Sequence, residues 1–175
     1  MLRVVLVAVI ALVIALALYL TTRPDSFRIQ RSAAIKAPPA RIFPLITDLH
    51  AWQGWSPWEK IDPALQRTYG GPASGPGAAY EWSGNKNVGK GRMEIIDQSP
   101  PSRVVIRLDF LEPFAGHNTA EFILQPAGEA TTVTWAMYGP NTLIAKVMGL
   151  FFSMDAMIGA QFEQGLATLK AEAER

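Results

Sequence analysis

The sequence predicts an α+β fold in which a curved antiparallel sheet wraps around a long C-terminal helix, behind one N-terminal transmembrane helix. Three observations predict it. Residues 4–20 are continuously apolar, residues 65–138 hold alternating segments separated by turns, and residues 142–173 contain no proline and repeat apolar side chains at helical spacing. A period of two is typical of strands with one buried face, and a period of 3.6 is typical of helices with one buried face.

The apolar run Val4–Leu20 is long enough to cross a membrane. Its 17 residues make a helix of roughly 26 Å, and Thr21 and Thr22 can extend it to the ~30 Å of a bilayer's hydrocarbon core. A cleaved secretory signal is the alternative, because Arg3 precedes the run and Ala15-Leu16-Ala17 fits a small-x-small cleavage pattern. A buried core helix is a third interpretation.

The length of the run favours an uncleaved anchor, since the apolar part of a secretory signal usually has about 7–15 residues. We therefore expect an anchor over residues 1–23, a linker over residues 24–26 and one folded domain over residues 27–175. Basic residues flank the run on both sides, so they assign no side of the membrane to the domain.

Composition disfavours several function classes. The chain has 16 Lys+Arg against 15 Asp+Glu and no basic run, which disfavours nucleic-acid binding. It has no cysteine and two histidines, His50 and His117, which excludes thiolate sites and a histidine-rich metal site. We expect no metal, no cofactor and no nucleic-acid partner.

The first half of the domain predicts a strand followed by short helices. Phe27–Lys36 alternates enough to form a strand, and Pro38 or Pro39 suits the first turn of a helix that reaches Leu49. His50–Lys60 holds three tryptophans with Gly54 and Pro57 between them. We expect this segment to form a compact loop or short helix over the core.

The second half predicts a meander covered by one helix. Alternating segments with short turns between them indicate antiparallel strands, and they comprise Leu65–Tyr69, Ala78–Ser83, Arg92–Asp97, Arg103–Leu111, Thr119–Gln125 and Thr131–Tyr138. One face of these strands is apolar. We expect a single amphipathic helix from Thr142 to about Ala173, with Asn141 as its cap, to cover that face.

The element order and several motifs resemble the helix-grip fold of the START/polyketide-cyclase (SRPBCC) superfamily over residues 27–171. The motifs are FRIQRSAAIKAPPARIF (27–43), WQGWSPW (52–58), YEWSGN (80–85) and VGKGRM (88–93). The sequence is most similar to the bacterial polyketide cyclase/dehydrase-type branch, whose members often follow an N-terminal membrane segment. The resemblance implies a bacterial inner-membrane location and a hydrophobic cavity between sheet and helix. It transfers no catalytic residue, because the superfamily contains binders as well as enzymes.

In this architecture the inward-facing residues would line the cavity. On the sheet they are Tyr80, Trp82, Met93, Ile95, Leu108, Phe110, Phe122, Trp135 and Met137, and on the helix Val147, Met148, Phe151 and Phe162. A filled core is the alternative at each position, since packing needs the same apolar stripe.

The candidate acid/base residues are His117 and Glu81. Histidine is the side chain that changes charge nearest neutral pH, and Glu81 lies between Tyr80 and Trp82. For both, an ordinary position at the surface is the alternative, because alternation turns Glu81 away from its apolar neighbours.

We expect a membrane-anchored domain that binds a hydrophobic small molecule or lipid, with the membrane as its second partner through residues 4–20. One alternative is a cyclase or dehydratase-type enzyme that uses His117 or Glu81. The other is a non-catalytic interaction module whose tryptophan segment, Trp52–Trp58, contacts a membrane or a protein.

Overall fold

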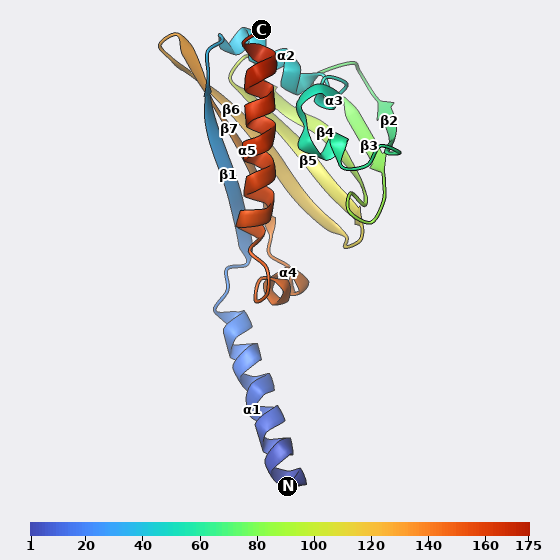
Figure 1. The fold of residues 1–175 in the computed structure, drawn as a ribbon, viewed down its shortest axis with the longest axis vertical. Coiled ribbons are helices and arrows are strands. Elements are labelled where there is room, and N and C mark those ends of the chain that lie inside the picture. Colours follow the sequence, from blue (N-terminus) through green and yellow to red (C-terminus); the bar gives the residue numbers. More distant parts are fainter.

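A computed structural model describes all residues, 1–175. Its first element, α1 (Leu2–Thr21), extends away from one end of the folded domain (Figure 1). None of its residues is buried, and its mean hydropathy reaches 3.0. At about 1.5 Å per residue, 20 residues span ~30 Å. This helix is long and apolar enough to cross a membrane, a property that anchors share with signal sequences.

Seven strands form one antiparallel sheet, in the order β1-β7-β6-β5-β4-β3-β2. The strands are β1 (Ser26–Ile35), β2 (Gln66–Gly70), β3 (Ala79–Ser83), β4 (Lys90–Ser99), β5 (Arg103–Glu112), β6 (Gly116–Ala127) and β7 (Ala130–Pro140). Each predicted strand overlaps an observed one. The curved sheet and the C-terminal helix confirm the predicted α+β fold class.

Two short helices and a 3₁₀ helix connect β1 to β2. They are α2 (Pro39–Thr47), α3 (Trp52–Trp55) and the 3₁₀ helix Pro57–Lys60. Trp52 and Trp55 are buried, and their indole N–H groups donate to the carbonyls of Ile46 (3.0 Å) and Leu45 (2.9 Å). These two side chains therefore belong to the core and are not free to contact a membrane or a partner, whereas Trp58 is half-buried.

The C-terminal segment forms two helices, so the prediction of a single helix from Thr142 is wrong. The helices are α4 (Leu143–Met148) and α5 (Met154–Ala173). The Thr142 hydroxyl accepts from the Ala145 N–H (3.3 Å) and the Ser153 hydroxyl accepts from the Ala156 N–H (3.1 Å). Each side chain satisfies a first-turn amide and so defines its own helix start. The predicted cap Asn141 instead donates to the Pro24 carbonyl at 3.0 Å.

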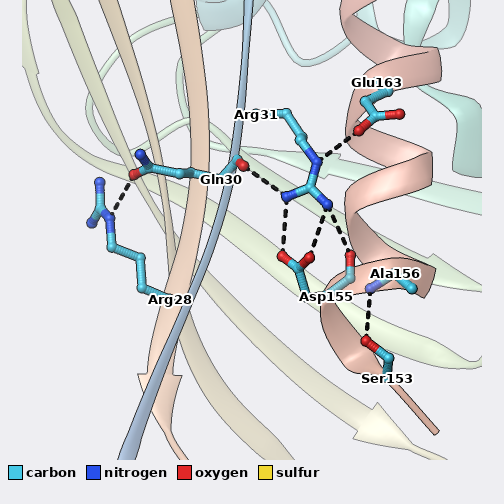
Figure 2. Close-up of polar contacts among 7 residues, drawn as sticks. All are labelled: Arg28, Gln30, Arg31, Ser153, Asp155, Ala156 and Glu163. Carbon is cyan, nitrogen blue, oxygen red and sulfur yellow. Dashed lines mark hydrogen bonds and ion pairs between the residues drawn. The ribbon is translucent and has the colours of Figure 1, made fainter.

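Arg31 of β1 holds the first half of α5 against the sheet (Figure 2). Its guanidinium donates to Glu163 Oε1 (2.7 Å), to both carboxylate oxygens of Asp155 (3.0 Å each) and to the Asp155 carbonyl (3.2 Å). A Cβ at Gly159 would overlap Arg31 Nη2, so the absence of a side chain there lets the guanidinium cross the helix. The hydrogen bonds from Arg31 lower the pKa of Asp155.

Fully buried core residues lie between α5 and the sheet at the end of the sheet farthest from α1, which we call the distal end. Ile35, Leu124, Val133, Leu166 and Leu169 are each at most 1% exposed there. The opposite end, where β1 begins beside the end of β7, is called the proximal end. Because β1 follows α1 directly, the proximal end faces the N-terminal helix (Figure 1).

Candidate functional site

A cavity of about 320 Å³ lies between the proximal half of the sheet and α5. This volume falls within the range of small-molecule sites, roughly 300–1,000 Å³. Of the 20 residues that line it, 15 are hydrophobic. The sheet contributes Tyr80, Trp82, Met93, Ile106, Leu108, Phe110, Ala120, Trp135 and Met137, and α5 contributes Ile158 and Phe162. The remaining lining residues are Trp52, Ser56, Trp58, Glu59, Leu65, Asn87, Val88, Glu112 and Pro113.

Strand register brings the wall together from separate parts of the chain. Met93 of β4 lies between Tyr80 of β3 and Leu108 of β5. Ala120 of β6 lies between Ile106 of β5 and Met137 of β7 in the same way. Because side chains alternate between faces along a strand, these residues point to one side of the sheet. The small Ala120 side chain leaves space between two long neighbours.

The cavity opens toward the proximal end. Among its lining residues, Asn87, Glu112 and Pro113 are exposed, and they lie at the connections β3–β4 and β5–β6. Tyr80 and Trp135, deeper in the wall, are buried. Both connections lie at the end of the sheet from which α1 extends (Figure 1). The mouth therefore faces the side of the domain that carries the N-terminal helix.

A buried carboxylate, Glu59, stands in the wall. Its side chain is 5% exposed, and its Oε1 accepts from the Tyr80 hydroxyl (2.6 Å) while its Oε2 accepts from Arg67 Nε (2.6 Å). Burial and the hydrogen bond to Glu59 raise the pKa of Tyr80, and the hydrogen bond to Glu59 raises the pKa of Arg67. The phenol therefore stays protonated and the guanidinium charged, which balances the buried carboxylate.

Trp135 supplies a hydrogen-bond donor that the protein does not use. Its ring stacks on Phe162 (centroids 4.3 Å apart) and on Phe122 (4.9 Å). Its Nε1 is buried and has no hydrogen-bond partner. A Cβ on Gly165 would lie 2.7 Å from Trp135 Cζ3, so the benzenoid edge faces α5 and the N–H edge points away from that helix. A buried N–H without an acceptor is unfavourable by about 1–3 kcal/mol.

The structure places most of the predicted lining residues in the wall, and it explains the exceptions. Those in the wall are Tyr80, Trp82, Met93, Leu108, Phe110, Trp135, Met137 and Phe162. Phe122 and Ile95 lie in the solid core instead. Val147, Met148 and Phe151 leave the sheet because the chain turns between α4 and α5, and Phe151 is 75% exposed.

Neither predicted acid/base residue reaches the cavity. The His117 side chain is 84% exposed, with Nδ1 2.7 Å from Asp109 Oδ1. Glu81 is also exposed and lies 3.4 Å from Arg92 Nε. Neither residue contributes to the lining. Sequence reasoning missed Glu59, whose 3₁₀ turn carries no periodic signal; its place beside Trp58 was the one available hint.

A curved antiparallel sheet closed by a C-terminal helix over an apolar cavity defines a helix-grip domain. The chain belongs to the family described as polyketide cyclase / dehydrase and lipid transport, whose sequence model matches residues 26–174. A separate search of the curated proteins found no match.

Solved structures show the same fold. A Chromobacterium violaceum protein has a TM-score of 0.61 at 16% identity, with 87% of this chain and 99% of that chain covered. A Mycobacterium smegmatis protein has a TM-score of 0.57 at 17% identity, covering 83% and 89%. Ara h 8.0201 has a TM-score of 0.57 at 14% identity, covering 85% and 97%. These identities show likeness of fold alone.

Proposed function

We propose that the protein is a membrane-anchored binding protein for an apolar small molecule or lipid, which it holds between the sheet and α5. The observation that carries the proposal is the cavity of about 320 Å³ with 15 hydrophobic lining residues among 20. Burial of apolar surface there contributes about 25 cal/mol per Å² to binding. We propose that the predicted residues found in the cavity wall contact the bound molecule.

The N-terminal segment supports a membrane location for this binding. In the proposal, residues 4–20 lie in the bilayer and residues 1–23 form the anchor, while residues 24–26 link it to the domain of residues 27–175. Four residues separate α1 from β1, and they span at most ~14 Å. The cavity mouth therefore stays close to the bilayer, where apolar molecules concentrate.

The wall also supports a chemical class for the occupant. Its surface is mostly hydrocarbon and aromatic, while Trp135 Nε1 is a buried donor without a partner. We infer an apolar molecule with one hydrogen-bond acceptor, such as a carbonyl or ester oxygen, that meets this N–H. Glu59 is already engaged by Tyr80 and Arg67.

Extraction of the purified full chain with organic solvent, followed by mass spectrometry, tests the proposal. Wild type should release a stoichiometric apolar molecule that carries an oxygen acceptor. Ala120→Leu fills the cavity and should lose that molecule, whereas Ala160→Leu places the same side chain on the exposed face of α5 and should keep it. Equal recovery from both variants, or recovery of nothing from wild type, would contradict the proposal.

Glu59 favours a second candidate function, a cyclase or dehydratase-type enzyme on the same class of molecule. It is the buried carboxylate of the cavity wall, and a carboxylate can accept a proton from a bound substrate. The Glu59→Gln variant keeps the shape of the side chain and removes the carboxylate that would accept the proton. If wild type returns an added ligand with altered mass and the variant returns it unchanged, the enzyme is favoured over the binding protein.

A further inference from the structure

An exposed apolar surface lies at the proximal end of the domain, outside the cavity. It consists of α4 and the turn that follows it, residues 143–152. Six large apolar side chains there are between 39% and 75% exposed: Leu143, Ile144, Met148, Leu150, Phe151 and Phe152. Contiguous exposed patches of this kind mark interaction sites on soluble domains.

The inner face of α4 is the more polar one. Ala145, Lys146 and Val147 are half-buried, and Lys146 is the one charged residue of the helix. No charged residue follows it before Asp155. A helix on the surface of a soluble protein turns its apolar stripe inward, so this segment has the opposite orientation.

Three polar contacts fix α4 beside the end of α1. Lys146 Nζ donates to Asp25 Oδ1 (2.6 Å), and the Asn141 backbone N–H donates to the Asp25 carbonyl (2.8 Å). The Asn141 side chain donates to the Pro24 carbonyl (3.0 Å). In addition, α4 contacts α1 directly. These contacts therefore hold the apolar surface at the level of the C-terminal end of α1, measured along the axis of that helix (Figure 1).

That end of α1 has the features of a membrane–water interface. The Arg23 guanidinium lies over the Tyr19 ring, 4.3 Å from its centroid. Tyrosine and arginine beside each other at a helix end are typical of the headgroup level, where one side chain is amphipathic and the other is charged. A segment held at this height touches the bilayer surface if α1 spans it.

We propose that residues 143–152 insert into the surface of the bilayer that holds α1. This inference rests on the proposed membrane anchoring. The bilayer is the occupant that fits, since the patch is continuous with α1, has no charge among its exposed side chains and lies on the side where the cavity opens. The inserted segment leads directly into α5, whose Ile158 lines the cavity, and so places the mouth against the lipid.

The absence of cysteine from the chain allows a direct test with single labels. The full-length Phe151→Cys and Glu129→Cys variants are labelled with an environment-sensitive fluorophore and reconstituted into phosphatidylcholine vesicles. Glu129 is the control, because it is exposed in the β6–β7 hairpin at the distal end. Phosphatidylcholine with brominated acyl chains then serves as the quencher.

The label at position 151 should emit at shorter wavelength and be quenched several-fold more than the label at position 129. Equal, water-like emission from both labels on vesicle-bound protein would overturn this inference and leave the anchor intact. A blue-shifted label at 151 that bromine does not quench would indicate a second copy of the chain and would also overturn it. Failure of the protein to float with vesicles would refute the anchoring itself.

Discussion

The two ends of the interface between the sheet and α5 are built from the same strands and the same helix, yet one is solid and the other hollow. At the distal end Leu124, Val133 and Leu169 are at most 1% exposed. At the proximal end Leu108 and Phe110 are only half-buried and line the cavity.

The difference arises from what lies between the two layers. At the distal end α2 and α3 contact α5, and Trp55 fills the space above Phe122, with ring centroids 6.1 Å apart. Trp52 and Trp135 lie at the boundary and form the inner wall of the cavity. At the proximal end α4 turns away from the sheet and toward α1. An apolar stripe therefore becomes a packed core or a cavity according to how completely the elements between the layers fill the space above it.

Matched phenylalanine truncations should give the largest contrast between the ends. Phe122→Ala removes a fully buried ring and should lower the free energy of unfolding by about 3–5 kcal/mol. Phe110→Ala trims a half-buried ring beside an existing cavity, so its cost should stay below about 2 kcal/mol. Denaturant unfolding of the full chain measures both. Equal losses would mean that the proximal end is as tightly packed as the distal end.

Replacement of Trp135 by phenylalanine should show whether the ligand at the hollow end accepts a hydrogen bond from the indole. Trp135→Phe removes the unpartnered Nε1 donor, and loss of one hydrogen bond worth about 0.5–1.5 kcal/mol lowers affinity roughly 2- to 10-fold. The loss should affect an apolar probe that carries a carbonyl. A pure hydrocarbon probe of the same length is the control, and an equal loss for both would show that the donor plays no part.

Acid should weaken the ion pair that holds the first half of α5 against β1. Hydrogen bonds from Arg31 lower the pKa of Asp155 from 3.8, so its stabilising effect is present above that value and is lost as pH falls through the lowered pKa. Asp155→Asn should therefore speed amide exchange around Met154–Ile158 near neutral pH and leave Leu166–Lys170 unchanged. This difference from wild type should shrink in acid. Glu129→Gln, in an exposed hairpin, should alter neither region.

Removal of the exposed histidine should have the smallest effect. Because His117 lies outside the lining and is 84% exposed, His117→Ala should change the free energy of unfolding by less than about 0.5 kcal/mol. Ligand occupancy, measured by extraction, should also stay unchanged. A large drop in occupancy would show that His117 contributes to ligand binding.

The features predicted from the sequence are those with a repeating signal. Strand alternation was enough to place Met93, Leu108 and Met137 on the inward face, and length alone marked α1. The break between α4 and α5 was missed because the apolar spacing continues through Phe151, although Ser153 is a residue type that caps helices. Phe122 and Trp135 lie at equivalent positions in the alternating pattern of their strands. Phe122 lies in the core and Trp135 lines the cavity because their neighbours from α3 and α5 differ, which the pattern does not show. Glu59 acts through partners distant in sequence, which no local pattern shows.

Photo-crosslinking with an apolar diazirine probe tests most directly whether the proximal end holds a ligand. The full chain in vesicles would be irradiated with a carbonyl-bearing probe, and adducts would be mapped by peptide mass spectrometry. We predict adducts at Met93, Leu108 or Met137, and none at Leu124 or Val133, while adducts on α1 report the membrane itself. Adducts confined to α1 and residues 143–152, with the cavity wall unlabelled, would contradict ligand binding between the sheet and α5.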